Sequence, residues 1–356
     1  MSLSRIILVG NPDEVHVGAH LRNAAATLGV ETHFFDSTRA FDAPGWRRRV
    51  DWWTRGRRPT RLREFSDGLA RAARELRPDA VLTTGIAPVD TAALRILRDL
   101  GVMSLNFLTD DPWNPAHRAP WFMEALAEYD HVFSPRQANR ADLESLAGPR
   151  VQYLQFAYAP EVHFPEAADR EAERRRYEAD VMFAGGADDD RVALVSTLIG
   201  RGLRVALYGG YWDKHPATRS HARGFVDAAG LRKATNGAAV CLCLVRRANR
   251  DGHSMRTFEI PAMDGCLLIE DTDEHRALFG EDDQAVVYFR SADEAARQAA
   301  ALVNDADRRR RLAAASYRLI TTGPHTYADR LSELLRIAME ARAENRSGRS
   351  RTLSRV

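Results

Sequence analysis

A short apolar run that ends in glycine and leads into an amphipathic helix occurs at the start of this chain and again past its middle. The first instance is Ile6 to Gly10, with a helical pattern from Val17 to Leu28. The second is Asp180 to Gly186, with a helical pattern from Arg191 to Arg201. Further apolar runs alternate with helical patterns after both. This alternation is typical of parallel sheets with helices on both faces, so the sequence predicts two Rossmann-like, doubly wound α/β domains.

The length of the chain fits this division. Its 356 residues exceed the roughly 250 at which a single core usually stops growing. Prolines and dense charges interrupt the pattern between the two halves, which indicates a linker. We therefore expect a first domain over residues 1–158, a linker over 159–178, a second domain over 179–323, a last helix over 324–342 and a mobile basic tail over 343–356.

Charge, cysteines and hydropathy limit the partners and the location. The 51 basic and 49 acidic residues give a formal net charge of +2, so nucleic acid is not an expected partner. Cys241, Cys243 and Cys266 lie in apolar runs, and their odd number predicts reduced core thiols and a cytoplasmic protein. The first apolar run is too short for a signal peptide, and no run approaches the roughly 20 residues of a membrane span.

The carboxyl ends of the two predicted sheets are expected to form a central cleft that holds the site. In the second domain, Gly185 and Gly186 form a strand-to-helix turn whose amides and helix dipole favour a diphosphate. Arg191 in the following helix would add a charged contact. Tyr208 and Gly209, at the end of the next strand, are expected on the same wall. A tight turn would explain the glycine pair equally well.

The most informative stretch is Asp251 to Asp271, which reads DGHSMRTFEIPAMDGCLLIED. A polar loop leads into a helix that carries Glu259, and a buried strand follows. Asp251 and Glu259 are separated by seven residues, a spacing that resembles the donor site of group 1 GT-B glycosyltransferases. Together with TDDPWN, DVMFAGG, VALYGGYW and HTYADR, the segment RTFEIPAMDGCLLIED is similar to the CgeB-like family of glycosyltransferases, and the matching blocks span nearly the whole chain.

This resemblance implies a GT-B fold in which the last helix crosses back to the first domain. It implies that Glu259 accepts hydrogen bonds from the donor ribose and that Asp251 contacts the donor sugar, although Asp251 is one methylene shorter than the usual glutamate. Arg256, one helical turn before Glu259, is a candidate for the donor diphosphate. We expect a nucleotide diphosphate sugar as donor, with UDP the favoured nucleotide, and retention of configuration follows from the resemblance alone. Glu259 also fits an ordinary helix carboxylate.

The first domain is expected to hold the acceptor. Asp110 and Asp111 follow a strand in the segment SLNFLTDDPWN, so either carboxylate is a candidate general base. Trp113 is a candidate to stack on a sugar ring, while turn capping before a proline is the alternative reading of both acids. His16 and Gly18, in the first strand-to-helix loop, resemble the acceptor-side loop of GT-B enzymes.

The segment Trp46 to Arg63 concentrates arginines and three tryptophans. This composition suits phosphates or a membrane surface, so an acidic or lipid-linked acceptor and peripheral membrane contact are open possibilities. A solvated loop with a few anchoring aromatic residues is the simpler alternative.

Other classes fit less well. Asp271-Thr272-Asp273 resembles the metal-binding motif of GT-A enzymes but comes too late in the chain, and no histidine or cysteine cluster has zinc spacing, so we expect no metal and no cofactor. Neither glycine turn has the dinucleotide fingerprint of an oxidoreductase. A sugar-nucleotide epimerase of GT-B architecture and a non-catalytic protein that binds nucleic acid or other anions remain alternatives.

Overall fold

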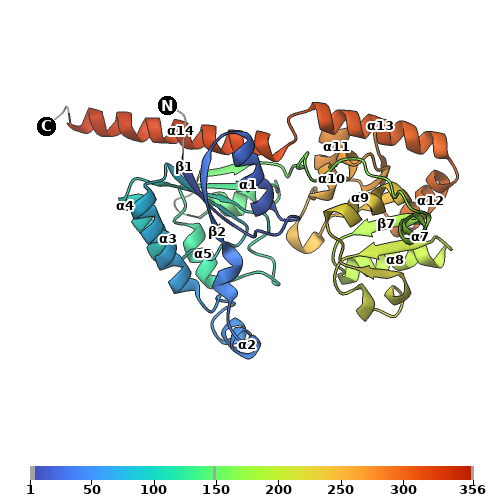
Figure 1. Ribbon diagram of the computed structural model, residues 1–356, viewed down its shortest axis with the longest axis horizontal. Coiled ribbons are helices and arrows are strands. Elements are labelled where there is room, and N and C mark those ends of the chain that lie inside the picture. The colour runs from blue at the N-terminus through green and yellow to red at the C-terminus, as the bar shows by residue number, and fades with distance from the viewer. Residues whose placement is uncertain (1–4, 147–149, 354–356) are drawn as a thin grey trace. The chain divides into compact units, whose positions relative to one another are not determined.

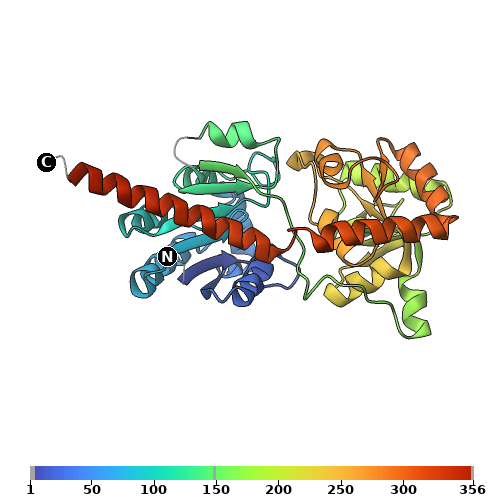
Figure 2. The ribbon, with the colours of Figure 1, turned by 90° about the horizontal axis from the view of Figure 1, so that it is seen from above.

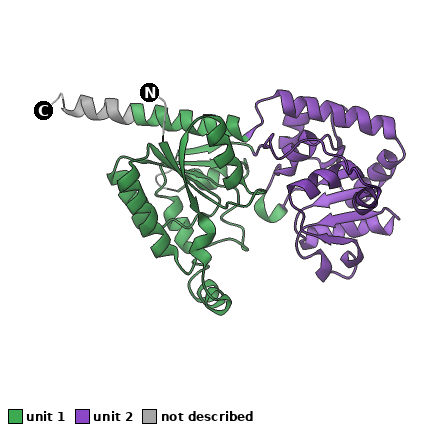
Figure 3. Ribbon diagram, in the orientation of Figure 1, with its two compact units in different colours: residues 1–155, 247–250, 327–356 green, residues 156–246, 251–326 purple. Residues whose placement is uncertain are grey.

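The computed structural model describes residues 5–146 and 150–353, with side chains up to residue 343. The chain divides into two compact units (Figure 3). The N-terminal unit contains residues 1–155, 247–250 and 327–356, and the C-terminal unit contains residues 156–246 and 251–326. Each unit is a parallel sheet flanked by helices (Figure 1), which confirms the predicted class of two doubly wound α/β sheets.

The sheet of the N-terminal unit has six described strands in the order β2-β1-β3-β4-β5-β6, all parallel. The order reverses between β1 and β3. The strands are β1 (Arg5–Gly10), β2 (Glu31–Asp36), β3 (Ala80–Thr84), β4 (Met103–Phe107), β5 (His131–Ser134) and β6 (Arg150–Tyr153). The helices are α1 (Val17–Thr27), α2 (Gly45–Thr54), α3 (Leu62–Leu76), α4 (Thr91–Asp99), α5 (Pro120–Leu126), α6 (Arg140–Glu144) and α14 (Tyr327–Leu353).

The last helix, α14, packs on the N-terminal unit. It lies next to α1, and the ring of Tyr327 stacks on the ring of His20 with centroids 4.9 Å apart. Figure 2, the view from above, shows α14 in red lying across this unit. The predicted return of the last helix to the first domain is therefore confirmed. The helix continues to Leu353 instead of ending near residue 342, and the mobility of the tail stays a prediction.

The sheet of the C-terminal unit has six described strands in the order β12-β11-β10-β7-β8-β9, also parallel. The order reverses between β7 and β10. The strands are β7 (Ala179–Ala184), β8 (Val205–Tyr208), β9 (Ala222–Gly224), β10 (Ala238–Cys243), β11 (Leu267–Glu270) and β12 (Val287–Phe289). The helices are α7 (Glu171–Tyr177), α8 (Asp189–Gly200), α9 (Ala228–Gly237), α10 (Arg256–Ala262), α11 (Asp273–Phe279), α12 (Ala292–Val303) and α13 (Ala306–Thr322).

Strand burial and helix capping explain why these elements form. In β1 every residue after Arg5 is buried, and in β4 and β5 all residues are buried, as expected of strands covered on both faces. Most helices of the C-terminal unit begin at a polar side chain that accepts a backbone N–H of the first turn. These caps are Asp188, Asp227, Thr272, Ser291 and Asp305.

Two expectations need correction. The segment 159–178 is not only a linker, because it contains α7 and the buried side chains of His163 and Tyr177, and it belongs to the C-terminal unit. Part of the segment Trp46 to Arg63 is the helix α2 rather than a loop. Charge density and prolines hid both features, since neither helix has a buried apolar stripe.

The three cysteines are free and buried, as predicted for core thiols. Burial raises the pKa of Cys241 well above its usual value and that of Cys266 to about 12, so these thiols stay protonated and unreactive. Within the described part of the chain, none of the helices combines the length and the apolar character that crossing a bilayer requires.

Candidate functional site

The strand order of the C-terminal unit marks a ligand position. In open α/β sheets, ligands bind beyond the carboxyl ends of the strands at the point where the order reverses. In this unit that point lies between β7 and β10. The segments that leave it are the glycine turn after β7 and the loop after β10 that leads into α10.

The glycine turn after β7 packs closely against the turn after β8. The N–H of Gly185 donates to Tyr208 O at 2.8 Å, and the N–H of Ala187 donates to Gly210 O at 3.0 Å. Gly209 has φ +127°, and a Cβ there would lie 2.4 Å from Gly185 O. The indole of Trp212 donates to the same carbonyl at 2.8 Å. Gly209 is therefore required by backbone packing, and Tyr208 contributes its carbonyl rather than its phenol to the turn.

Arg191 lies beneath this turn. It is 8% exposed, and its guanidinium donates to Gly186 O at 3.1 Å and Leu244 O at 3.4 Å. The side chain thus ties the turn after β7 to the end of β10. Asp188 caps α8 by accepting from Arg191 N at 3.0 Å. These bonds make Arg191 a positioning residue in this structure, and its predicted phosphate contact stays a prediction.

A second arginine, Arg246, lies beside the turn and was missed from the sequence. Its side chain is 31% exposed, and its Nε lies 3.6 Å from a carboxylate oxygen of Asp188. A Cβ on Gly186 would stand 3.6 Å from its Nη2. Gly186 and Arg246 therefore form one side of the reversal point, with amide and guanidinium groups suited to a diphosphate. The local pattern gave no signal, because Arg246 follows an apolar strand with no motif around it.

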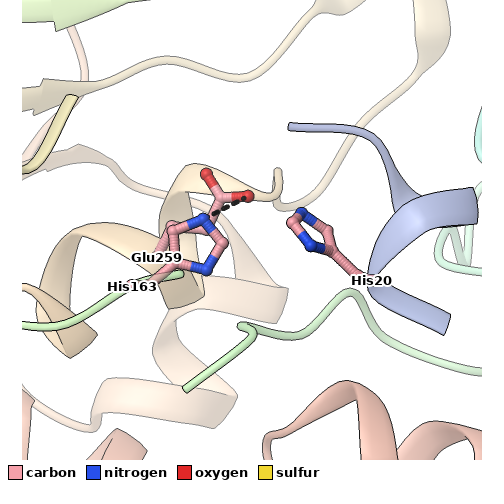
Figure 4. Close-up of side chains that lie close together, drawn as sticks. All are labelled: His20, His163 and Glu259. Atoms are coloured by element: carbon pink, nitrogen blue, oxygen red, sulfur yellow. Dashed lines mark ion pairs between the residues drawn. The ribbon is translucent and has the colours of Figure 1, made fainter. Parts of the chain in front are cut away.

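Helix α10 places a guanidinium and a carboxylate at the same reversal point of the sheet. Arg256 donates to Ala184 O, the last residue of β7, at 3.1 Å, and it forms an ion pair with Glu259. Glu259 is fully buried. Its Oε1 lies 3.6 Å from His163 Nε2, an ion-pair distance that is too long for a hydrogen bond (Figure 4). Among the described residues, this oxygen has no hydrogen-bond partner.

The protonation of His163 follows from its other ring nitrogen. The N–H of Ala159 donates to His163 Nδ1 at 3.0 Å, so that nitrogen carries no proton. The neutral ring therefore has its proton on Nε2, the atom that faces Glu259. His163 was not a candidate in the sequence because it lies in the segment interpreted as a linker.

The start of α10 is fixed by a buried hydrogen-bond chain. The N–H of Ser254 donates to Thr257 Oγ1 at 3.0 Å, and this hydroxyl donates to His275 Nε2 at 3.0 Å. On the other side, His275 Nδ1 donates to Glu270 O at 2.7 Å. Burial lowers the pKa of His275 to about 4, so the ring is neutral and can serve as donor and acceptor at once.

This histidine predicts a pH dependence of stability. Its pKa falls from 6.5 in the unfolded chain to about 4 in the folded protein, so between pH 6.5 and about pH 4 the unfolded state binds a proton that the folded state does not. Stability should therefore be lost as the pH falls from 6.5 to about 4, by roughly 3 kcal/mol from this group. Urea unfolding of the wild type and of His275→Gln at several pH values tests this prediction. The variant should be less stable than the wild type at neutral pH but should lose less stability than the wild type on acidification. Equal losses in both proteins would contradict the assignment.

Asp251 closes the loop between β10 and α10. Its carboxylate accepts from Arg246 N at 3.3 Å, and its own N–H donates to Arg246 O at 3.3 Å. Gly252 follows, and a Cβ there would lie 2.4 Å from the Glu274 carboxyl carbon. Asp251 is thus held at the reversal point next to Arg246, and its contact with a donor sugar stays a prediction.

In the segment Asp271-Thr272-Asp273, which resembles a GT-A metal-binding motif, the side chains make contacts within the protein. Arg276 donates to both carboxylate oxygens of Asp271, at 2.6 and 2.9 Å, and Arg290 donates to one of them at 2.8 Å. Thr272 caps α11. Asp271 is thus engaged by two arginines.

The structure separates the two candidate acids of the N-terminal unit. Asp111 is 1% exposed, and its two oxygens accept from Arg250 at 2.6 and 3.1 Å. The same guanidinium lies over the ring of Trp113, 5.6 Å from its centroid. Asp110 is partly exposed, and its carboxylate accepts a long hydrogen bond of 3.4 Å from Thr109 Oγ1. Asp110 is therefore the better candidate base, and one face of Trp113 is already covered.

The first loop of the N-terminal unit also differs from expectation in detail. His16 is exposed and precedes α1 without a capping hydrogen bond from its side chain. Gly18 is buried, and a Cβ on it would lie 2.8 Å from Asn11 N, so it is required by the close packing of α1 against the strand end. In the same helix His20, which the sequence did not single out, is buried.

The N-terminal unit also has a cavity of about 590 Å³ between η1 (Ser37–Phe41) and α3. Its lining includes Asp36, Arg39, Arg61, Glu64 and Phe65. Charged side chains of both signs and an aromatic ring line it.

Known structures share the architecture of the two units, which is the GT-B fold. Sucrose-phosphate synthase from Thermosynechococcus elongatus superposes with a TM-score of 0.67 at 10% identity, over 96% of this chain and 100% of that one. Anabaena HepE in complex with UDP and glucose gives 0.63 at 10% identity, over 95% and 100%. A putative UDP-N-acetylglucosamine 2-epimerase from Listeria monocytogenes gives 0.55 at 13% identity, over 97% and 98%.

Part of the chain also matches a protein-family model. Residues 191–336 match the model described as glycosyl transferase-like. The match runs from α8 through α10 into α14, so it includes Arg246, Arg256 and Glu259. No curated protein matches the sequence.

Proposed function

We propose that this protein is a glycosyltransferase that takes a sugar from a nucleotide diphosphate sugar, with UDP as the nucleotide. The donor binds at the reversal point of the C-terminal sheet. The glycosyl transferase-like match over residues 191–336 and the UDP in the similar Anabaena structure support this proposal.

One observation carries the donor assignment. Glu259 is fully buried, and its Oε1 has no hydrogen-bond partner among the described residues. A buried hydrogen-bond acceptor without a partner destabilises the protein by about 1–3 kcal/mol, and by more if it is charged. A ligand that donates hydrogen bonds to Glu259 is therefore favoured at this position. The two adjacent hydroxyls of a ribose are such donors. Glu259 is therefore proposed to bind the ribose, with Arg256 fixing its other oxygen.

The diphosphate is proposed to lie between the glycine turn and the partly exposed Arg246 and Arg256. Gly186 leaves its backbone open to a ligand, while Arg246 and Arg256 have side chains 31% and 27% exposed. Both guanidinium groups would stabilise the negative charge that develops on the leaving nucleotide. Asp251 is proposed to contact the sugar. The transfer is proposed to need no metal and to retain the anomeric configuration.

The acceptor is proposed to bind the N-terminal unit. Asp110 is proposed as the residue that holds or deprotonates the acceptor hydroxyl, since the carboxylate of Asp111 is engaged by Arg250. His16 and Gly18 contribute the first loop, and Trp113 is proposed to contact the acceptor. The acceptor itself is not assigned.

An epimerase is the second candidate, favoured by the similar structure of the Listeria protein. It would use the same donor site without an acceptor. The two activities differ in product, because transfer releases UDP, whereas epimerisation returns a UDP-sugar of the same mass.

The first test is titration calorimetry with UDP, GDP, CDP, TDP and NAD, each in magnesium and in EDTA. UDP should bind with the same affinity in both buffers, and UDP-sugars should yield UDP once an acceptor is supplied. Binding of NAD alone, or of no nucleotide, would overturn the proposal. Binding that disappears in EDTA would overturn the metal independence, and isomeric UDP-sugars as the sole products would establish the epimerase.

A further inference from the structure

Three of the four large apolar side chains of α2 point away from the protein, and the fourth, Trp52, is 37% exposed and lies against the guanidinium of Arg57. Trp46, Val50 and Trp53 are 70%, 51% and 76% exposed. Their positions differ by four and three residues, so they lie on one face of the helix. In Figure 1, α2 projects from the N-terminal unit beyond α3 and α5.

The inward side of α2 is polar. Asp51 is the buried residue of this helix, at 6% exposure, and its carboxylate oxygens lie 3.4 Å from Arg55 Nε and 4.0 Å from Arg47 Nε. A helix that packs on its own core buries its apolar face and exposes its acids. The reverse arrangement in α2 leaves two indoles and a valine in water, which is unfavourable unless another surface covers them.

The surroundings of the apolar face are strongly basic. Arg47 and Arg49 are exposed and flank this face of the helix. Further exposed arginines stand on the other side of the helix and in the segment that follows, namely Arg48, Arg55 and Arg58. The acid of the helix, Asp51, is turned inward and paired. An apolar strip of tryptophan edged by arginine is complementary to a membrane surface, where indoles reside among headgroups and arginines contact phosphates.

We propose that α2 docks the protein on a membrane rich in anionic lipid. Trp46, Val50 and Trp53 enter the boundary between headgroups and acyl chains, and the arginines bind the lipid phosphates. A second copy of this chain suits the face less well, because pairing two such helices would bring their arginines together. This inference stands independently of the proposed function, since it uses no residue of the donor site.

Vesicle flotation of the full chain tests the proposal. The protein should float with vesicles of equal parts phosphatidylglycerol and phosphatidylcholine, and stay behind with phosphatidylcholine alone or at high ionic strength. Trp46→Ser/Trp53→Ser should weaken binding by at least about tenfold. Arg47→Gln/Arg49→Gln, which removes the two arginines that flank the apolar face, should weaken it by about fivefold for each charge removed. Phe225→Ser, which removes an aromatic residue that is 85% exposed on the C-terminal unit, should change nothing.

Several results would overturn the inference. These are failure of the wild-type protein to float, equal binding by the tryptophan variant, or equal loss in the Phe225→Ser control. A dimer in light scattering that the tryptophan variant abolishes would assign the face to a second copy instead. Binding of a single-stranded oligonucleotide that displaces vesicles would assign it to nucleic acid. Calorimetry with UDP on the same variants separates this result from the proposed function, because their UDP affinity should equal that of the wild type.

Discussion

Replacing Glu259 by glutamine is expected to weaken nucleotide binding by roughly 10- to 100-fold while the protein stays folded. The change keeps the size of the side chain but removes the charge that Arg256 pairs with and that ribose hydroxyls would bind. Hydrogen bonds to charged groups are worth about 1.5–3 kcal/mol, and each 1.4 kcal/mol corresponds to about tenfold in affinity. Arg256 stays anchored through its bond to Ala184 O.

Titration with UDP and thermal unfolding of the same samples measure the two effects separately. Glu281→Gln is the matched control, because Glu281 is a glutamate of the same unit whose side chain is 82% exposed. It should bind UDP as the wild type does. A folded Glu259→Gln variant with unchanged UDP affinity would remove Glu259 from the donor site, and loss of affinity in both variants would show that charge in general, rather than this position, governs binding.

The sequence predicted the fold because its strong signals are local. The strand β1 and the helix α1 were expected within one residue of where they occur, since one is a short apolar run and the other a regular helical pattern. The elements that were not predicted, such as α7 and α2, have no buried apolar stripe. Their positions depend on charge pairs and single buried side chains, which leave no periodic pattern.

From the sequence, contacts in the site could be predicted only between residues that are close together in the chain. Glu259 and Arg256 share a helix turn, and their proximity was expected. The partner of Asp111 is Arg250, 139 positions away, and it reaches the N-terminal unit through a four-residue segment of the loop after β10. His163 likewise faces Glu259 from a segment that reads as a linker. Such contacts follow from the tertiary fold, so no spacing rule could reveal them.

The second large effect concerns Gly209. An alanine Cβ at this position would lie 2.4 Å from Gly185 O and 2.7 Å from Gly185 C, and φ is +127°. Both obstacles are backbone, so no side chain can rotate away and the glycine turn after β7 must shift. We expect Gly209→Ala to lower the free energy of unfolding by about 3 kcal/mol or more and to weaken UDP binding through the displaced turn.

Alanine variants of two other glycines distinguish the steric clash at Gly209 from the strain of its positive φ. A Cβ on Gly200, at the end of α8, would point into open space, so Gly200→Ala should stabilise the protein by about 0.5–1 kcal/mol. Gly202 has equally open space but φ +85°, so Gly202→Ala should cost about 1 kcal/mol through backbone strain alone. Urea unfolding ranks the three variants. A cost at Gly209 no greater than that at Gly202 would mean that the turns after β7 and β8 are not in contact in solution, and the diphosphate assignment would lose its framework.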